Sequence, residues 1–393
     1  MKTRTMTFCI LMLLMGACCE SAAEKRKFKH PSILATQAGL AALKERITTN
    51  PSARLGHELL KRSRYADLSR PHTPYAVVKV VASGVCKEER AFRDDAHAAH
   101  ATALMWVITG DNRYRNKAMS ILDDWSTTYE KITVSKGRAI QAQLEAAWAA
   151  PIWTAAADII RYYDGGSAGW KHDQIAAFDR FLNSMVRTAR GARKRNNNWG
   201  TSATLAIIAA AVYQEDEAAY TEAVALHKRH LRSISEKSGA LGPDYLRDPW
   251  HPQYTVLTWI HTCEIAWNQG DDLYGLKLDG QSVPRLAICL EHFAKLFLGK
   301  LPNPKGLRRG DYKGSHKQRQ GYEMAFNHFI ERRSLAKSMP TFVKMVPDWR
   351  PGGIDAHFIA WDTLTHGGLD SGQRPSVDQG RQKQNKPDAG DGK

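Results

Sequence analysis

Two stretches that share one pattern decide the fold: Ala103-Leu-Met-Trp-Val-Ile-Thr-Gly-Asp-Asn-Arg-Tyr114 and Cys263-Glu-Ile-Ala-Trp-Asn-Gln-Gly-Asp-Asp-Leu-Tyr274. Each reads as an apolar helix that the sequence Gly-Asp-x-x-Tyr closes. In both copies the glycine suits the left-handed residue after a helix, and the aspartate suits the cap of the next helix. A third, degenerate copy runs over residues 207–220. Helical hairpins that stack in this way build an open solenoid or a closed toroid, and we expect the toroid because the repeats vary in length and separation.

The rest of the chain has helical periodicity as well. Apolar residues recur at helical spacing from Thr36 onward, whereas β-branched runs such as Tyr75–Val81 are short and isolated. We expect helices over residues 37–48, 53–67, 88–109, 113–129, 140–163, 173–189, 202–213, 217–235, 254–268, 283–298 and 320–338. The sequence therefore predicts an all-α protein, an (α/α) toroid or incomplete helical barrel built of helical hairpins.

The N-terminus has the features of an export signal. Lys2 and Arg4 precede a ten-residue apolar run, 6–15, which is too short to span a bilayer and suits a signal-peptide core. Small residues before Glu24 suit ordinary signal cleavage, whereas Met15-Gly-Ala-Cys18 is a loose lipoprotein box in which Cys18 would carry lipid. Both endings stay open, and we expect a periplasmic or secreted protein.

These signals divide the chain into three parts. We expect a signal peptide over residues 1–23, a single toroid domain over 24–370 and a disordered tail over 371–393, which is polar and lacks large apolar residues. No stretch after the signal reaches the roughly 18 apolar residues of a transmembrane helix.

Charge narrows the range of partners. Lys and Arg outnumber Asp and Glu by 56 to 40, for a formal net charge of +16, and such a balance favours polyanionic partners. Export argues against nucleic acid, which leaves an anionic polysaccharide or a lipid surface as the expected partner. No metal-ligand or cofactor motif of useful specificity is present, so we expect neither a metal nor a cofactor.

The first candidate site is the polar cluster Arg193-Lys-Arg-Asn-Asn-Asn-Trp-Gly200, which lies directly before an apolar helix. Its asparagines could simply cap that helix. An asparagine at a helix N-terminus, with Trp199 beside it and cations upstream, is also well suited to hold a sugar carboxylate. We therefore take Asn197, Asn198 and Trp199 as candidate substrate contacts.

The second candidate site is the stretch 238–254, which is dense in groups that bind anions or exchange protons. Arg247, His251 and Tyr254 stand out in it. Together with the Asn cluster, this stretch supplies the residue types that an enzyme acting on uronic acids needs.

At these residues the chain resembles the alginate-lyase superfamily of polysaccharide lyases, over residues 30–367. The similar segments are 93–118, with Asp-Ala, an apolar helix, Thr-Gly-Asp and Lys-Ala; Asn197-Asn-Trp-Gly200; Gly239-Ala-Leu-Gly-Pro243 with Arg247 and Tyr254; Tyr322-Glu-Met-Ala-Phe326; and Trp361-Asp-Thr-Leu-Thr-His366. The resemblance implies a helical toroid that cleaves uronic-acid polymers.

The resemblance also implies catalytic roles. Asn198 would bind the C5 carboxylate and stabilise the enolate that develops, and Tyr254 would take the C5 proton. Because an unperturbed phenol has a pKa near 10, a neighbouring cation is needed to favour the phenolate, and Arg247 is our candidate.

One position departs from the family pattern, because Trp199 stands where the family often has histidine. His251 could replace that group, orient the substrate or transfer a proton, or the carboxylate could be held by Asn and water alone. Elimination at D-mannuronate or D-glucuronate needs a single tyrosine, since H5 and O4 lie on one face, whereas L-guluronate needs two groups. Because Trp199 replaces the motif histidine, we expect the route with a single tyrosine, and therefore polymers of mannuronate or glucuronate.

Two further regions are expected to line a substrate cleft. Residues 70–85 lie where, by the resemblance, related enzymes have a mobile segment over the cleft. They would form a lid that brings Tyr75 onto the substrate, or else a passive connection between helices. In the basic loop 303–319, Lys305, Arg308 and Arg309 would attract uronate carboxylates, and Tyr312 would stack on a sugar ring. Two alternatives from other classes remain: a non-catalytic protein that binds polyanionic glycans, and a helical-toroid glycoside hydrolase that uses Asp244.

Overall fold

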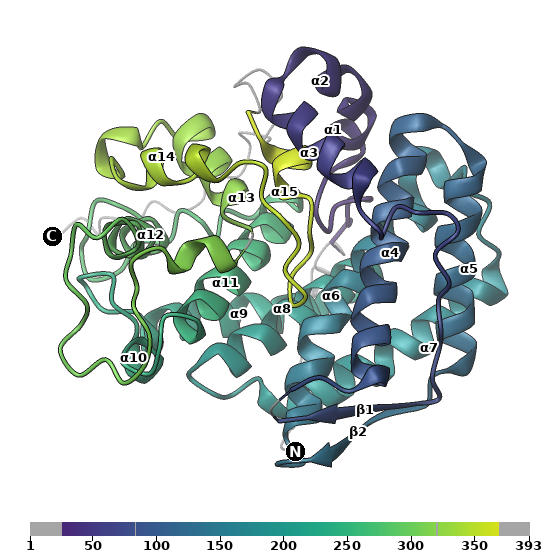
Figure 1. The fold of residues 1–393 in the computed structure, drawn as a ribbon, viewed down its shortest axis with the longest axis horizontal. Coiled ribbons are helices and arrows are strands. Elements are labelled where there is room, and N and C mark those ends of the chain that lie inside the picture. The colour runs from purple at the N-terminus through teal and green to yellow at the C-terminus, as the bar shows by residue number, and fades with distance from the viewer. Residues whose placement is uncertain (1–25, 83, 320, 369–393) are drawn as a thin grey trace, which may run out of the picture.

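The computed structural model describes residues 26–82, 84–319 and 321–368, which form a ring of helices (Figure 1). The expected signal peptide and polar tail lie outside the described residues. Within them, no helix combines the length and the apolar character that crossing a bilayer requires.

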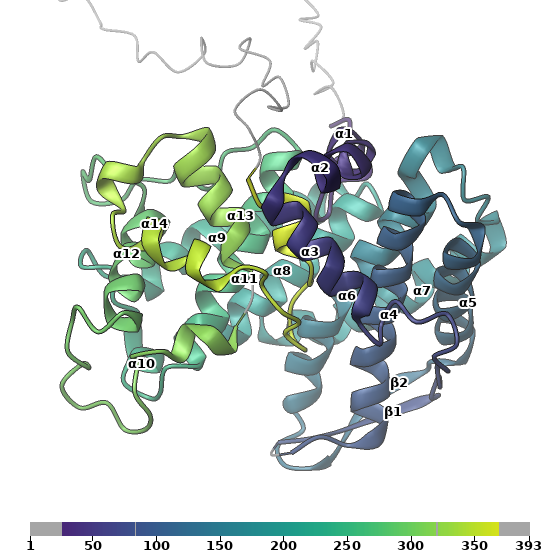
Figure 2. The same cartoon turned by 45° about the horizontal axis from the view of Figure 1, so that its top comes forward.

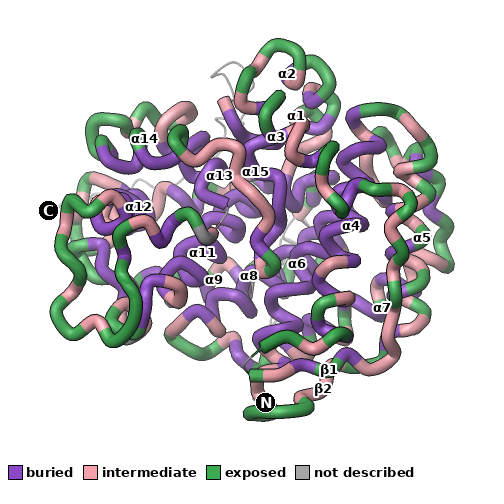
Figure 3. Tube along the Cα trace, in the orientation of Figure 1, coloured by how far each residue is buried: buried purple, intermediate pink, exposed green. Residues whose placement is uncertain are grey.

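The inner wall of the ring consists of α4 (Lys87–Thr109), α6 (Gln141–Tyr162), α8 (Asn198–Tyr213) and α11 (His251–Asn268). Helix α4 packs on α6, α6 on α8, and α8 on α11. Helices α6 and α8 are buried along almost their whole length, as the tube coloured by burial shows (Figure 3). Their sequences are apolar on all sides, which is the composition of a helix with neighbours all round it.

The outer layer consists of α5 (Asn112–Thr128), α7 (His172–Ala189), α9 (Glu217–Ile234) and α12 (Arg285–Phe297). Each of these helices packs on one or two inner helices and buries one apolar stripe, while its polar face is exposed. The alternation of inner and outer helices confirms the predicted (α/α) toroid.

Short helices from the two ends of the chain close the ring. Contacts run from α11 to α13 (Tyr322–Phe326), on to α15 (Asp362–His366), then to α3 (Pro51–Arg62) and through α2 (Leu43–Thr49) to α4. At the α3–α15 contact a Cβ on Gly56 would lie 2.5 Å from the Leu364 nitrogen, so the two backbones meet at a distance that requires glycine. Figure 2 shows α3 beside α15 at this junction.

The remaining elements are short. They are α1 (Gln37–Ala41), α10 (Gly242–Tyr245), α14 (Phe342–Met345), a π-helical turn (Asn327–Arg332), 3₁₀ turns (Tyr163–Gly166, Arg190–Ala192, Ser315–Gln318, Ala336–Ser338 and Pro347–Trp349) and the strands β1 (Val77–Val81) and β2 (Lys131–Lys136). The expectation of an isolated β-branched run is therefore wrong, because β1 pairs with β2 in parallel. The long helix expected over 320–338 is also divided, between α13, the π turn and a 3₁₀ turn.

The Gly-Asp repeat is confirmed in its glycines and in one of its two aspartates. Gly110 and Gly270 both adopt positive φ, 72° and 94°. Asp111 caps α5 by accepting a hydrogen bond from the Arg113 amide. Asp271 caps no helix: its carboxylate accepts from the Arg26 guanidinium and the Tyr220 hydroxyl, because α12 does not begin until Arg285.

The four inner helices run in the same direction, so their N-termini lie at one end of the ring, and the candidate site lies at that end. Near their N-terminal ends, Arg93 of α4 bonds Glu145 of α6, and Trp148 of α6 stacks near Tyr254 of α11. At the C-terminal ends, the Tyr162 hydroxyl of α6 donates to the Tyr213 carbonyl of α8. The N-termini of these helices therefore gather at one end of the ring, where their partial positive charges favour an anion.

Candidate active site

Tyr254 lies in the first turn of α11, and its phenol oxygen accepts a hydrogen bond from the Arg319 guanidinium at 2.5 Å. The ring centroid lies 5.3 Å from that of Trp148 and 5.2 Å from that of His357. The tyrosine is 9% exposed, so its hydroxyl group is held in one place by packing and by a charged donor.

Arg319 is held by a buried carboxylate. Its guanidinium donates to Asp355 at 2.9 Å, and Asp355 also accepts from the backbone amide and the ring Nδ1 of His357. Burial by itself raises the pKa of Asp355, but the hydrogen bond and charge of His357, followed by the charge of Arg319, lower it to about 2. Asp355 is therefore ionised at neutral pH and fixes both Arg319 and His357.

A second arginine lies under this group. Arg93 of α4 bonds both oxygens of Glu145 and one oxygen of Glu89, and it lies 3.4 Å from Nε2 of His357. Burial and the charge of Glu145 raise the pKa of Glu89 to about 7. The Arg93 charge is thus already balanced by carboxylates on two helices.

Burial determines the protonation state of Tyr254. Burial raises the pKa of the Tyr254 phenol, and the charges of Arg319 and Arg93 oppose that rise without cancelling it. The group is a phenol at neutral pH in this structure, and its phenolate becomes more populated as pH rises.

The cation at the Tyr254 hydroxyl is Arg319, which corrects our assignment of Arg247 to that place. Arg247 lies 3.7 Å from Asp248 and its side chain is 46% exposed. The sequence led to Arg247 because it lies seven residues from Tyr254, whereas Arg319 reaches the phenol from a loop 65 residues further along the chain.

His251 forms a dyad with Asp248, which is fully buried. Its Nδ1 lies 2.7 Å from Asp248 Oδ1, an arrangement that leaves Nε2 as the ring atom open to a substrate. Arg309 donates to the same carboxylate at 2.9 Å. The His251 ring lies 6.0 Å from that of Tyr254, so the structure brings these two predicted residues together.

The Asn cluster begins helix α8 at the same end of the ring. Asn197 is the N-cap and accepts from the Trp199 amide at 3.1 Å, whereas Asn198 is buried in the first turn. In the described part of the chain the Asn198 side-chain amide bonds no other residue, which leaves it available to a ligand. The Arg195 guanidinium lies 5.3 Å from the Trp199 ring. Gly200 is required here because a Cβ would lie 1.9 Å from the Arg195 carbonyl.

The basic loop lies against this site on one side. Lys305, Arg308 and Arg309 are exposed, and the Arg308 amide donates to the Leu246 carbonyl, just before the Asp248 dyad. Tyr312 is not a stacking platform: it is fully buried and its hydroxyl donates to the Tyr245 carbonyl. That prediction was wrong because an aromatic residue in a charged loop can anchor the loop in the core.

The expected lid is bonded to the ring. Arg70 lies 2.7 Å from Asp95 of α4, and the Thr73 amide donates to the same carboxylate. Tyr75 is half-buried near Trp125, with 6.5 Å between their rings. The structure therefore places Tyr75 against the α4–α5 pair.

A cavity of 460 Å³ lies beside the first turns of α4. Lys87 and Arg90 line it, together with Asp94 and Asp95, which already have arginine partners. None of Tyr254, His251 and Arg319 lines this cavity, which lies between α4 and the segment that contains Arg70 and Thr73. Among the described residues no group of three or more His, Cys, Asp or Glu side chains could hold a metal ion.

Comparison with known proteins agrees with this geometry. A family model described as alginate lyase matches residues 42–294, well over half of the chain. No curated protein matches it.

Solved structures have the same fold. Alginate lyase A1-III from Sphingomonas species A1 superposes with a TM-score of 0.61 at 15% identity, covering 85% of this chain and 97% of that chain. An alginate lyase from Bacteroides ovatus gives 0.61 at 14% identity, covering 87% and 100%. A variant of A1-III complexed with tetrasaccharide gives 0.58 at 16% identity, covering 85% and 96%.

The family match and the toroid together define the class of the protein, which is a polysaccharide lyase. It belongs to the alginate lyase family, as the motifs in its sequence predicted.

Sequence reasoning missed several residues of this site, namely Arg93, Trp148, Arg319, Asp355 and His357. Arg93 begins the family-like segment 93–118, and this was a usable signal. Arg319, Asp355 and His357 lie beyond residue 294, where the family match ends. Arg319 is the last residue of the basic loop 303–319, which was a usable signal, whereas Asp355 and His357 have no local motif to mark them.

Proposed function

We propose that this enzyme is exported and cleaves 1,4-linked uronic-acid polymers, alginate rich in mannuronate or glucuronan, by β-elimination. The observation that carries the proposal is the Tyr254 hydroxyl, held by a guanidinium at 2.5 Å at the end of the ring where the inner helices begin. The signal-like segment before residue 24 supports export.

The anionic polymer would be attracted by several fixed charges. Arg309 bonds Asp248 beside His251, and Lys305 and Arg308 are exposed in the same basic loop. The N-termini of the inner helices add partial positive charge at this end of the ring. These cations are exposed to solvent, so they can bind successive carboxylates of a uronate chain without first being buried.

Elimination would proceed at the sugar next to Tyr254. The Asn198 amide would bond the C5 carboxylate and stabilise negative charge as it develops. The Tyr254 phenolate takes the C5 proton, the electrons of that C–H bond form the C4–C5 double bond, and the C4–O4 bond breaks. The new phenol then returns its proton to the departing O4, so Tyr254 ends as a phenolate again.

His251 would be the second polar group at the reacting sugar. Asp248 fixes its ring, and Nε2 can bond the carboxylate or a sugar hydroxyl in the place of the histidine that Trp199 replaces. Arg247, exposed next to this dyad, is placed to bind a carboxylate of the same chain. Under this mechanism one tyrosine both removes and returns the proton, which favours mannuronate or glucuronate over guluronate.

The test is an assay of the purified protein on polymannuronate, polyguluronate and glucuronan, followed by the ultraviolet absorbance of the C4–C5 double bond. We expect absorbance to rise with polymannuronate or glucuronan and not with the Tyr254→Phe variant. New reducing ends without absorbance would mean hydrolysis, as in the Asp244 alternative. Binding without either signal would mean a glycan-binding protein.

A further inference from the structure

The C-terminal part of the chain completes the site. The family match ends at residue 294, yet Arg319, Asp355 and His357 come from segments beyond it and lie within bonding or ring contact of Tyr254 or of one another. In Figure 1 the yellow-green chain that leads into α15 passes through the middle of the ring. This passage brings the residue 355–357 turn to the N-terminal ends of the inner helices.

The charged groups around Tyr254 come from every neighbouring element. Arg93 on α4 faces it with Glu89 and Glu145 behind, and Asp248 and His251 lie before it and on its own helix. The other charges come from the C-terminal segments.

Of these groups, Arg319 is the cation that donates to the phenol oxygen. Arg93 is clamped by Glu145 and Glu89, and Arg247 lies beside Asp248. The guanidinium of Arg319 spans two acceptors at once, the Tyr254 oxygen and the Asp355 carboxylate. Its planar fork allows this double contact, which a lysine ammonium does not reproduce with the same fixed geometry.

We propose that Arg319, held in place by Asp355, is a positioning residue for the elimination: it fixes the Tyr254 hydroxyl and stabilises its phenolate. This inference rests on the proposed role of Tyr254 as the base. The residue acts through Tyr254, so its effect is on the ionisation of the phenol.

A spectroscopic titration tests the proposal without relying on activity. The ultraviolet difference between the wild type and Tyr254→Phe, followed with pH, isolates ionisation of this one phenol. The same difference between Arg319→Gln and the double variant Arg319→Gln/Tyr254→Phe isolates it without the guanidinium. We expect the midpoint to rise by about one pKa unit or more, a tenfold loss of phenolate at a given pH, with the alkaline rise of kcat displaced to match.

A matched control removes a charge from the same segment without touching the phenol. Lys317→Gln, two residues away and exposed, should leave the midpoint unchanged. Should Arg319→Gln fail to fold by circular dichroism, Arg319→Lys replaces it, with an expected shift in the same direction of at least about half a unit.

Two results would overturn the proposed role of Arg319, and a third would separate it from the proposed role of Tyr254. An unchanged midpoint in a folded Arg319 variant, or an equal shift in Lys317→Gln, would overturn the proposal. If instead Arg319→Gln shifts the midpoint but Tyr254→Phe still eliminates at the normal rate, the positioning by Arg319 stands and the role of Tyr254 as base fails.

Discussion

The two ends of helix α11 are surrounded by the same kinds of residue in opposite bonding arrangements. At the N-terminal end the Tyr254 oxygen accepts from Arg319. Toward the C-terminal end the hydroxyl of Tyr274, which comes from the segment after α11, donates a hydrogen bond to Glu264 at 3.0 Å. An acceptor bond from a cation favours loss of the phenol proton, whereas a donor bond to a carboxylate retains it.

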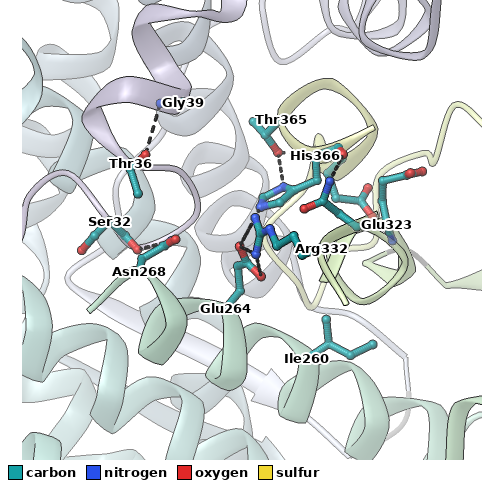
Figure 4. Close-up of polar contacts among 12 residues, drawn as sticks. Ser32, Thr36, Gly39, Ile260, Glu264, Asn268, Glu323, Arg332, Thr365 and His366 are labelled. Atoms are coloured by element: carbon teal, nitrogen blue, oxygen red, sulfur yellow. Dashed lines mark hydrogen bonds and ion pairs between the residues drawn. The ribbon is translucent and has the colours of Figure 1, made fainter. Parts of the chain in front are cut away.

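The surroundings of Tyr254 and Tyr274 differ as well. Glu264 also contacts Arg332 and His366, which tie the π turn and α15 to α11 (Figure 4). Tyr274 is fully buried, whereas Tyr254 is 9% exposed. The same residue types therefore favour ionisation of the phenol at the end that we propose to be reactive, where the phenol oxygen is an acceptor near the surface. At the other end they form a structural anchor, because each group bonds another inside the core.

The largest expected effect separates the two tyrosines. Tyr254→Phe should reduce elimination by a factor of about 10²–10⁴ or more while the fold stays intact, because it removes the hydroxyl that transfers protons. Tyr274→Phe should keep its activity per folded molecule and lose about 1–3 kcal/mol of stability. Ultraviolet product assays with thermal melts check both. Tyr254→Phe with most of its activity would remove this residue from the mechanism.

Next in size is the effect of breaking the anchor. Glu264→Gln removes the buried carboxylate from the half-buried Arg332 guanidinium, so we expect a loss of about 2–3 kcal/mol in the free energy of unfolding, measured by denaturant titration at neutral pH. The pKa of Glu264 is lowered by its partners, Arg332 foremost. The stability it provides is therefore present above its unfolded pKa of about 4.5 and is lost as pH falls below that value.

Glu264→Gln should change stability and leave activity unchanged. Activity per folded molecule of Glu264→Gln should equal that of the wild type. A variant that is as stable as the wild type, or one that is stable and inactive, would contradict the division of α11 into an anchored end and a reactive end.

The pH dependence of the rate sharpens the comparison. Because burial raises the pKa of Tyr254, its basic form is in the minority at neutral pH. The kcat should then rise by about tenfold per pH unit from about pH 7 upward, as long as the protein stays folded. The same profile is expected for Tyr274→Phe, since burial and Glu264 keep that phenol protonated. A flat or falling profile over this range would rule out a phenolate base.

The smallest effect concerns the exposed loop beside the reactive end. Replacing Arg308 and Arg309 together by Ala should raise the KM for long polymers by about threefold at low salt and weaken its salt dependence. The kcat should change less. Lys61→Ala/Arg62→Ala on α3 removes two exposed charges elsewhere and should change neither quantity. Equal salt slopes in the wild type and the loop variant would assign this loop to the general surface.

The sequence by itself determined the fold class and the local chemistry. Apolar residues at helical spacing and two Gly-Asp closures specify helical hairpins, because a helix with one or more apolar faces must bury them against neighbours. The motifs around Asn198 and Tyr254 also indicated the family, since they are short segments whose residue types and order are visible along the chain.

Only the tertiary structure decided which cation reaches the phenol and which aromatic residue faces solvent. Arg319 and Tyr254 are 65 residues apart along the chain and meet only in the folded protein. Tyr312 is buried because its loop folds back on α12 and Tyr245. Helical periodicity shows which face of a segment is apolar. It does not show which distant segment covers that face, or which charged residues pair across it. Those pairings depend on distances between elements, which only packing fixes.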